Sequence, residues 1–269
     1  MDTPNSRLRF SLSWQMLFSL LMFGFMYLPI LVLAFYSFNE SPYSAGWKGF
    51  TWNWYYQFFT DTRILTALGN SLVVAFSATS IAAILGTLMA VGLARYQFPG
   101  KGLYQGVAYL PLIIPDIAMA VATLVFLAAA AIPLSGGTIV AAHVVFCLSY
   151  IALVVSTRIN GINPHLEEAA LDLGATPAQA FTKVLLPELA PAIVSGCLLA
   201  FVLSMDDFLI ASFTAGDGVK TLPIEIFGRI RTGVKPDINA LSVTLILASG
   251  LVFFVAEYIR YRSEQKRLQ

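Results

Sequence analysis

The stretch LEEAALDLGATPAQAFTKVLLPELAP, residues 166–191, is a polar and sharply punctuated segment of an otherwise apolar chain. Asn163-Pro164 precedes it, Gly174 divides it, and Thr176-Pro177 comes soon after that glycine. Asn and Thr are favoured helix N-caps, Pro is favoured at the first helical position, and Gly commonly ends a helix. The stretch therefore predicts two short helices that meet at a corner near Gly174.

Each of the two predicted helices has a narrow apolar face. In the second helix, Thr176 and Gln179 have the spacing of a capping box, and the apolar face continues as far as Pro187. A helix of about 10 residues is stable chiefly through packing, so we expect this insert to dock on a surface rather than serve as a solvated connector. The apolar residues of the first helix recur at helical spacing: Leu166, Ala169, Ala170 and Leu173.

The rest of the chain has the composition of an integral membrane protein. Hydrophobic residues make up 58% of the 269 residues and charged residues only 12%, against about a quarter charged in soluble domains. Uncharged runs of about 20 residues are long enough to span a bilayer as helices, which satisfy their own backbone groups. We therefore predict an all-α membrane protein, a single domain of residues 1–269 with six transmembrane helices. The predicted spans are Trp14–Phe38, Leu68–Ala94, Tyr104–Ala131, Thr138–Thr157, Ala192–Phe213 and Ile238–Ile259.

The distribution of basic residues predicts the orientation of these spans. Six spans place both termini on one side, and that side has more Lys and Arg than the other, with Arg95 and Arg260 directly at span ends. The positive-inside rule then places both termini in the cytoplasm. The polar insert, about residues 160–190, is cytoplasmic in this arrangement, and the outer loops are about residues 39–66 and 214–238. The net charge of +1 gives no reason to expect a nucleic acid partner.

Several spans carry features that predict their shape or packing. In the third span, Pro111 and Pro115 each remove a backbone hydrogen bond and predict a bend. Cys147 and Cys197 fall within spans, which favours plain packing over a disulfide or a metal site. In the second span, small residues recur at every fourth position and predict a stripe on which a neighbouring helix packs closely: Ala78, Ala82, Gly86, Ala90 and Ala94.

Three carboxylates lie inside the predicted spans, at Asp116, Asp206 and Asp207. A charge near the bilayer centre costs about 2.5 to 3.5 kcal/mol, so such groups usually face a polar cavity or a partner. Successive residues point about 100° apart on a helix, so we expect Asp206 and Asp207 to differ in role. The three residues predict a pathway for a cationic cargo; the alternative is that they are neutral carboxyls that hydrogen-bond between helices. His143 is predicted to make an interhelical hydrogen bond.

The insert resembles the EAA loop of permeases from binding-protein-dependent ABC importers. The resemblance rests on Glu168-Ala169-Ala170, on Gly174, and on Val184-x-Leu186-Pro187. It implies the type I ABC importer permease fold, in which this chain is one half of a transmembrane pair and the insert sits in a groove of a cytoplasmic ATPase. The residues for which it implies a coupling role are Glu168, Ala169, Ala170, Asp172, Gly174, Ala175, Thr176, Pro177 and Pro187.

Other motifs extend this resemblance over the chain from about Asn53 onward. Asn70-Ser71-Leu72 opens the second span and Arg95-x-x-Phe98-x-Gly100 closes it, as in the same family. The chain has no phosphate loop of its own, because Gly100-Lys101-Gly102 lacks the upstream Gly and the following Ser or Thr. We therefore expect a non-catalytic subunit that binds no cofactor, with ATP and Mg bound by the partner ATPase.

The cargo class is also indicated by resemblance. PLIIPDIAMA (111–120), LSMDDFLIASF (203–213) and TLPIEIFGRIRTGVKPDINAL (221–241) are similar to the spermidine/putrescine permeases, and most similar to the second permease subunit of putrescine systems. This similarity implies polyamine import across a bacterial inner membrane. The implied partners are a second permease subunit, two copies of a cytoplasmic ATP-binding subunit, and a periplasmic polyamine-binding protein, which docks on a face that residues 214–239 help to form.

A self-sufficient ion-coupled carrier for a cationic solute remains the alternative function. In such a carrier the intramembrane Asp residues would relay protons. The insert discriminates between the two functions, because a carrier has no need of a docking corner on its cytoplasmic side.

Overall fold

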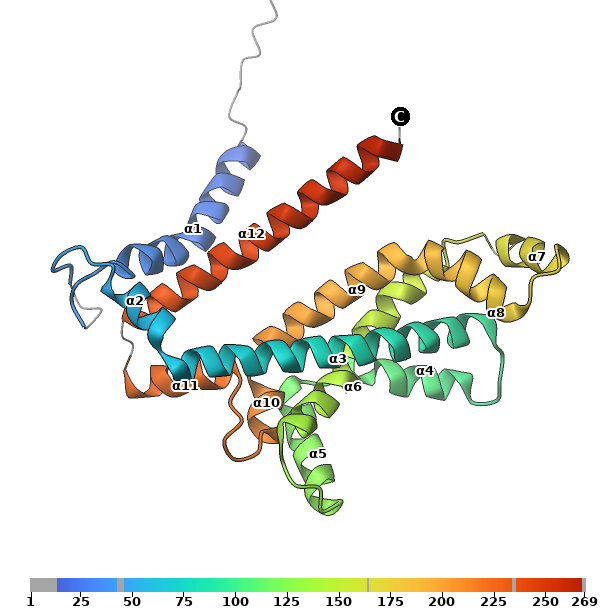
Figure 1. The fold of residues 1–269 in the computed structure, drawn as a ribbon, viewed down its shortest axis with the longest axis horizontal. Helices are drawn as coiled ribbons and strands as arrows, with labels where there is room; N and C mark the ends of the chain where they lie inside the picture. Colours follow the sequence, from blue (N-terminus) through green and yellow to red (C-terminus); the bar gives the residue numbers. More distant parts are fainter. Residues whose placement is uncertain (1–13, 43–45, 164, 234–235, 268–269) are drawn as a thin grey trace, which may run out of the picture. The chain divides into compact units, whose positions relative to one another are not determined.

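The computed structural model describes residues 14–42, 46–163, 165–233 and 236–267 (Figure 1). Within these ranges the chain consists of helices and loops, with one isolated β-bridge between Asn39 and Phe50. The all-α prediction is therefore confirmed. The chain divides into two compact units, residues 1–61 with 229–269 and residues 62–228. The predicted single domain of residues 1–269 stays a prediction.

The first unit contains α1 (Trp14–Tyr36), α2 (Asn53–Thr60) and α12 (Pro236–Arg267), and α11 (Leu222–Thr232) crosses the boundary between the units. The second unit contains α3 (Thr62–Arg95), α4 (Lys101–Tyr109), the 3₁₀ turn η1 (Leu110–Leu112), α5 (Asp116–Ala129), α6 (Gly136–Ile159), α7 (His165–Asp172), α8 (Pro177–Ala180), the π-helical turn η2 (Phe181–Leu185), α9 (Leu186–Asp206) and α10 (Leu209–Thr214).

Polar contacts organise the first unit. The fully buried Asn39 accepts a hydrogen bond on its backbone carbonyl from Trp54 Nε1 at 2.7 Å. Arg229 donates to the carboxylates of Asp61 and Asp237 at 2.6 and 3.1 Å. These contacts fix the loop after α1 and join the residue before α3 to the start of α12. Residues 234 and 235 of the predicted outer loop lie outside the described residues.

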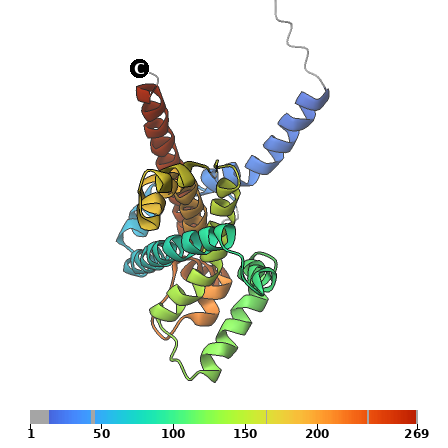
Figure 2. The same cartoon turned by 90° about the vertical axis from the view of Figure 1, so that its right-hand side faces the viewer.

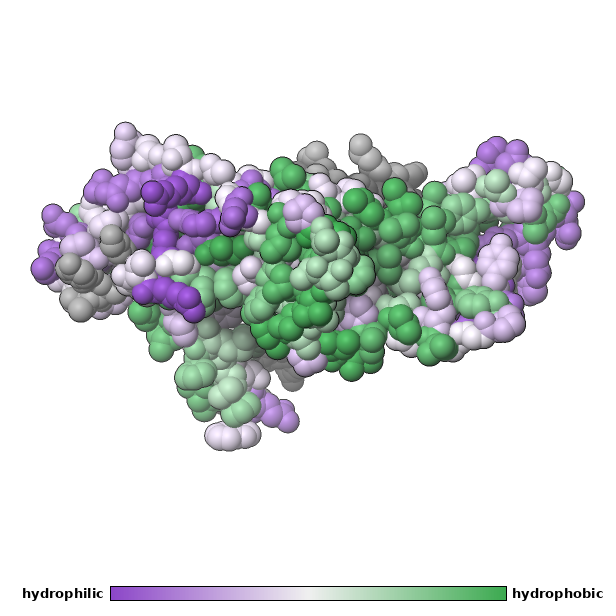
Figure 3. All heavy atoms as spheres, turned by 90° about the horizontal axis from the view of Figure 1, so that it is seen from below, coloured by the Kyte–Doolittle hydropathy of each residue, from purple (hydrophilic) through white to green (hydrophobic). Residues whose placement is uncertain are grey.

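Four or five of the six predicted spans correspond to helices of suitable length within the described residues. In the described part of the chain, α1, α3, α6 and the helical stretch Pro177–Asp206 are long and apolar enough to cross a membrane, and the pair α4–η1 and α5 adds a fifth if its two parts count as one span. α12 begins at Pro236, close to the predicted start of the sixth span, and is apolar over Pro236–Leu251. Figure 3 shows a broad apolar surface and a hydrophilic end at α7 and α8.

The stripe of small residues on α3 lies at the core of the second unit, where α3, α6 and α9 pack together. Ala78, Ala82 and Ala90 are fully buried and Gly86 is buried, as predicted. Ala94 is exposed, so the stripe ends one helical turn earlier than expected.

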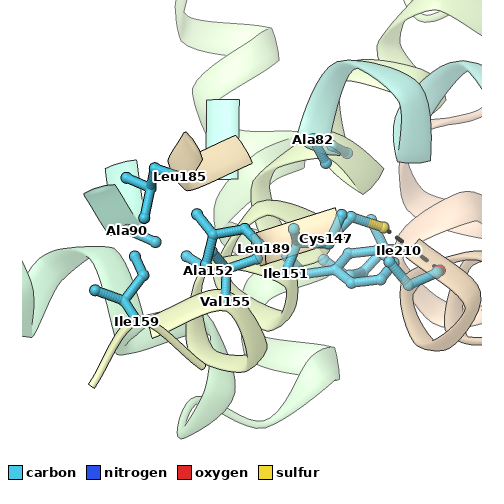
Figure 4. Packing of buried hydrophobic residues seen from close by; sticks show 14 residues of the cluster. Ala82, Ala90, Cys147, Ile151, Ala152, Val155, Ile159, Leu185, Leu189 and Ile210 are labelled. Atoms are coloured by element: carbon cyan, nitrogen blue, oxygen red, sulfur yellow. Dashed lines mark hydrogen bonds between the residues drawn. The ribbon is translucent and has the colours of Figure 1, made fainter. Parts of the chain in front are cut away.

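Figure 4 shows how large side chains fill the space beside these small ones. Ile151 of α6 and Leu189 of α9 have no exposed surface, and both belong to the same cluster as Ala82 and Ala90. Cys147 lies in this cluster too, and its Sγ donates to the Ala200 carbonyl at 3.6 Å. Both cysteines are free thiols.

Gly86 permits a close approach of α3 and α6. A Cβ at this position would lie 2.9 Å from the Leu148 carbonyl oxygen and 3.3 Å from the Ala152 amide nitrogen. We expect Gly86→Ala to lower the free energy of unfolding by about 1 to 3 kcal/mol, because the two backbones have to move apart. Thermal unfolding in detergent measures this. Gly92→Ala on the same helix is the matched control, since a Cβ there meets no atom within 4 Å; equal midpoints for the two variants would contradict the expectation.

The third predicted span is broken rather than gently bent. α4 with η1 and α5 meet at an angle of 110° (Figures 1 and 2). Pro111 lies in η1, and Pro115 precedes α5 with an extended ψ of 137°. Neither proline can donate a backbone hydrogen bond, and a proline at the first positions of a helix is well tolerated. The two prolines therefore end one helix and begin the next.

The fifth predicted span, Ala192–Phe213, needs correction at both ends. The helical stretch runs from Pro177 to Asp206 without interruption, so Pro187 does not end a separate helix as predicted. The π turn η2 widens the helix just before Pro187, with the Leu186 amide bonded to the Phe181 carbonyl, and such turns accommodate a helix irregularity. At the other end, Asp207 is extended (φ −67°, ψ 122°) and separates α9 from α10.

Candidate functional site

The corner of the polar insert has the geometry that the sequence predicts. Gly174 follows α7 with a φ of +86°, a left-handed conformation that favours glycine. The Gly174 amide donates to the Leu171 carbonyl at 2.9 Å, and the Ala175 amide donates to the Ala170 carbonyl at 3.0 Å. This pair of bonds is the Schellman motif, which satisfies the last carbonyl groups of a helix. The chain therefore turns sharply at Gly174.

The predicted caps are present at the start of both arms of the insert. Asn163 Oδ1 accepts a hydrogen bond from the His165 amide at 3.1 Å, whereas Pro164 lies outside the described residues. At the second arm, Thr176 Oγ1 accepts from the Gln179 amide at 3.3 Å and Gln179 Oε1 accepts from the Thr176 amide at 2.9 Å. This reciprocal pair is a capping box. The second arm is not a separate helix, because it continues through η2 into α9.

The residues predicted to contact an ATPase lie on the surface of this insert and at the adjoining start of α9. No residue of α7 is buried, and Leu173 is 90% exposed. Leu166 and Leu171 of α7 are exposed as well, and exposed apolar side chains that lie together often mark an interaction surface. Among the predicted coupling residues, Ala170 and Ala175 are half-buried, and the exposed ones are Glu168, Ala169, Asp172, Gly174, Thr176, Pro177 and Pro187.

The two glutamates of the insert have different partners. Glu168 contacts the exposed His165 on its own helix, at 2.7 Å between Oε2 and Nδ1. Glu167 instead pairs with Arg95 at the end of α3, at 2.7 Å between Oε1 and Nη2, with both side chains more than two-thirds buried. Arg95 belongs to the motif that closes the second predicted span. The Arg95–Glu167 ion pair thus ties α7 to the central helix α3.

We expect reversal of either charge in the Arg95–Glu167 pair to impair coupling. Arg95→Glu or Glu167→Arg brings two like charges together in a partly buried position, where their repulsion is only weakly screened. Cargo uptake per ATP hydrolysed should fall several-fold in each variant. The double variant Arg95→Glu/Glu167→Arg restores opposite charges and should recover most of that ratio. If the loss of uptake per ATP in the double variant equalled the sum of the losses in the single variants, the ion pair would not be the cause of the impaired coupling.

The three predicted acidic residues line one cavity of the second unit, with a volume of about 290 Å³. Asp116 is the first residue of α5, Asp206 is the last of α9, and Asp207 follows it. All three therefore lie at helix breaks, and not in the interior of continuous spans as predicted. Pro111 also lines the cavity, as do residues of α6 and α10 and the aromatic rings of Phe146, Tyr150 and Phe208.

Asp206 and Asp207 have different surroundings. Asp207 has a largely buried side chain, whose Oδ1 and Oδ2 accept hydrogen bonds from the Ile210 and Ala211 amides at 3.3 and 2.8 Å. It therefore caps α10. Asp206 and Asp116 are exposed, and within the described ranges neither forms an ion pair or a side-chain hydrogen bond. The adjacent aspartates therefore have different surroundings, and the expectation that they differ in role stays a prediction.

Sequence reasoning missed the aromatic lining of the cavity. Phe146 and Tyr150 are one helical turn apart on α6, and Phe208 contacts Phe227 in a tilted arrangement with ring centroids 4.4 Å apart. Aromatic residues are common in apolar spans. These three could have been recognised as cavity-lining residues only from the positions of the two helix breaks. His143 was predicted to bond between helices, and this is confirmed: its Nδ1 lies 2.7 Å from Ser204 Oγ of α9.

The motif Asn70-Ser71 has a structural use in the second unit. Asn70 Nδ2 donates to the Lys220 carbonyl at 2.9 Å, and Ser71 Oγ accepts from the Leu222 amide at 2.8 Å. These bonds attach Lys220 and the first residue of α11 to the N-terminal third of α3. No function in binding is needed to explain the motif.

Broken apolar helices, an acid-lined cavity and an exposed capped corner define a helical membrane transport subunit. The chain belongs to the family described as binding-protein-dependent transport system inner membrane component, whose profile matches residues 82–269. It is accordingly a multi-pass inner membrane protein.

Curated relatives and a solved structure agree with this family. The chain is 42% identical to the putrescine transport system permease protein PotI of Escherichia coli over 263 residues, covering 95% of this chain and 94% of that protein. It is 38% identical to the spermidine/putrescine transport system permease protein PotC of Haemophilus influenzae, covering 90% and 94%. A bacterial ABC transporter involved in the import of the acidic polysaccharide alginate has the same fold, with a TM-score of 0.72 at 14% identity over 96% of this chain and 98% of that one. The predicted type I importer permease fold is confirmed.

Proposed function

We propose that this chain is one of two transmembrane permease subunits of an ATP-driven importer for polyamines of the putrescine and spermidine class. The observation that carries the proposal is the convergence of Asp116, Asp206 and Asp207 on one cavity with three aromatic rings. Carboxylates compensate an ammonium group for lost hydration, and aromatic faces attract cations. The relatives named above transport putrescine and spermidine, which are cations of this kind.

The size of the cavity suits a small cargo. Its volume of about 290 Å³ is just below the range of about 300 to 1,000 Å³ for small-molecule sites. In our proposal the chain supplies one half of the pathway, and a second permease subunit faces it. Asp116 and Asp206 lie on separate helices and have no partner among the described residues, so they are the carboxylates assigned to the cargo.

The insert is proposed to couple transport to ATP hydrolysis by a cytoplasmic ATPase. Its corner is exposed, and its second arm belongs to the same 30-residue helical stretch, Pro177–Asp206, that ends at the cavity. A displacement of the corner would move this helix and with it Asp206. The chain itself is proposed to be non-catalytic and to bind no cofactor, and two ATPase copies would bind ATP and Mg.

The remaining partners follow from the family. A binding-protein-dependent system implies a periplasmic binding protein, which is proposed to deliver polyamine to the outer face near residues 214–239. Both termini and the insert are proposed to be cytoplasmic, in agreement with the excess of basic residues on that side.

Reconstitution in proteoliposomes tests this function. The chain is purified with its partner permease and ATPase and supplied with the binding protein and radiolabelled putrescine. We expect accumulation that requires ATP and stops when the ATPase is omitted. Accumulation that persists without the ATPase and follows an imposed proton gradient would favour the ion-coupled carrier instead. ATP-dependent accumulation of other solutes but not polyamines would refute the cargo class alone.

A further inference from the structure

His143 is a fully buried polar residue beside the acid-lined cavity. It lies on α6, and its Nδ1 is 2.7 Å from Ser204 Oγ on α9. Its Nε2 is 3.2 Å from Asp207 Oδ2. A buried polar ring in an apolar bundle is costly unless it has partners, so both contacts contribute to its place in the fold.

The chemistry of the two partners determines which nitrogen of the His143 ring carries the proton. An ionised carboxylate only accepts hydrogen bonds, so a proton on Nε2 faces Asp207, and in the neutral ring Nδ1 then accepts from the Ser204 hydroxyl. Nε2 makes no well-aligned hydrogen bond within the described residues. The contact with Asp207 is therefore an electrostatic one between a partly positive N–H group and a carboxylate.

Asp207 is held from two sides by this arrangement. Its oxygens accept from the first amides of α10, at 2.8 Å for Ala211, and Oδ2 also faces His143. The side chain of Asp207 is only 10% exposed. The contacts of its carboxylate stabilise the break between α9 and α10. This break places Asp206 at the cavity.

We propose that His143 is a positioning residue that, through Asp207, sets the separation of the cargo-facing carboxylates Asp206 and Asp116. This inference rests on the proposed function. A diammonium cargo has two charges a fixed number of methylene groups apart, so the separation of two carboxylates can select for cargo length. His143 does not contact the cargo itself and acts only by fixing the helix break.

Two substitutions test the contacts of the two ring nitrogens separately. In His143→Gln, the longer amide can place an N–H group near the former Nε2 position and keep the contact with Asp207. In His143→Asn, the shorter amide reaches only the former Nδ1 position and leaves Asp207 without its second partner. Both variants are compared with wild type in the complete importer, with uptake of a four-carbon and a five-carbon diamine as the measurement.

We expect His143→Asn to raise the KM for putrescine by about tenfold, equivalent to about 1.4 kcal/mol, and to reduce discrimination between the two diamines. His143→Gln should stay close to wild type in both respects. Equal effects of the two substitutions, or a loss of stability with unchanged KM and unchanged discrimination, would overturn the proposed role.

Thermal unfolding gives a readout that does not depend on the cargo. The midpoint shifts of His143→Asn and Asp207→Asn should be non-additive in the double variant, because both remove the same contact. Additive shifts would overturn the link between His143 and Asp207. If wild type imports no polyamine, the proposed function fails, while the coupling between the two residues is still decided by this cycle.

Discussion

Gly174→Val is expected to abolish most ATP-driven uptake while the protein still inserts and folds. The residue has a φ of +86°, a conformation that costs an ordinary residue about 1 to 2 kcal/mol and a β-branched residue more. That cost changes an equilibrium roughly 5- to 30-fold. Because no residue of α7 is buried and its ion pair with Arg95 lies at the first turn, away from Gly174, the corner would open and the insert would lose its fit to the ATPase. Retention of the ATPase during purification and putrescine uptake measure the effect.

Two controls separate the corner from general strain. Gly174→Asn should be tolerated much better, since Asn visits the left-handed region more readily than other residues. Gly100→Val imposes a similar strain at a φ of +80° before α4, and a Cβ at either glycine meets no atom within 4 Å. We expect Gly100→Val to retain the ATPase. Equal loss in Gly174→Val and Gly100→Val would mean that the corner has no special role.

The corner could be predicted from sequence because its determinants are local. Gly174 and the capping box of Thr176 and Gln179 act within a few residues of one another, and all are confirmed. The stripe of small residues on α3 could be predicted for the same reason, since one helix presents a regular period. Short-range chemistry therefore gave the right elements in the insert and the right packing face in the core.

The break after Asp206 could not be predicted in this way. No Pro or Gly lies between Ser204 and Thr214, and the local sequence favours a continuous apolar helix. The break is stabilised by Asp207, which caps α10 and faces His143, a residue 64 positions earlier. Such tertiary contacts outweigh local propensity. At Pro187 the local sequence predicts a helix end that does not occur. The π turn η2 just before the proline lets the helix continue past it.

Prediction of the cavity requires both local sequence signals and tertiary contacts. The three aspartates could be selected from sequence because charged residues are rare in apolar spans. Their convergence could not, since Asp116 and Asp206 come from helix ends that only the two breaks bring to one cavity. The structure also distinguishes Asp207, which has backbone and imidazole partners, from the two exposed carboxylates.

Asp116→Asn and Asp206→Asn are each expected to raise the KM for putrescine by about tenfold or more. A hydrogen bond to a charged group contributes about 1.5 to 3 kcal/mol, and each 1.4 kcal/mol corresponds to a factor of ten. Because the two residues are assigned to different ends of the cargo, their effects should be close to additive in the double variant. Asp207→Asn should instead lower the thermal unfolding midpoint, because the amide is a weaker acceptor for the α10 amides.

The control for this prediction is a carboxylate on the same helix that does not line the cavity. Glu188 of α9 is 48% exposed and pairs with Arg158 at 2.9 Å, and an exposed pair of this kind contributes about 0 to 1 kcal/mol. Glu188→Gln should therefore leave the KM for putrescine unchanged. If Glu188→Gln raised KM as much as Asp206→Asn, the effect would reflect net charge on α9 and not the cavity. If Asp116→Asn and Asp206→Asn both kept the wild-type KM at equal expression, the two carboxylates would not bind the cargo, because the loss of a charged partner cannot leave its binding free energy intact.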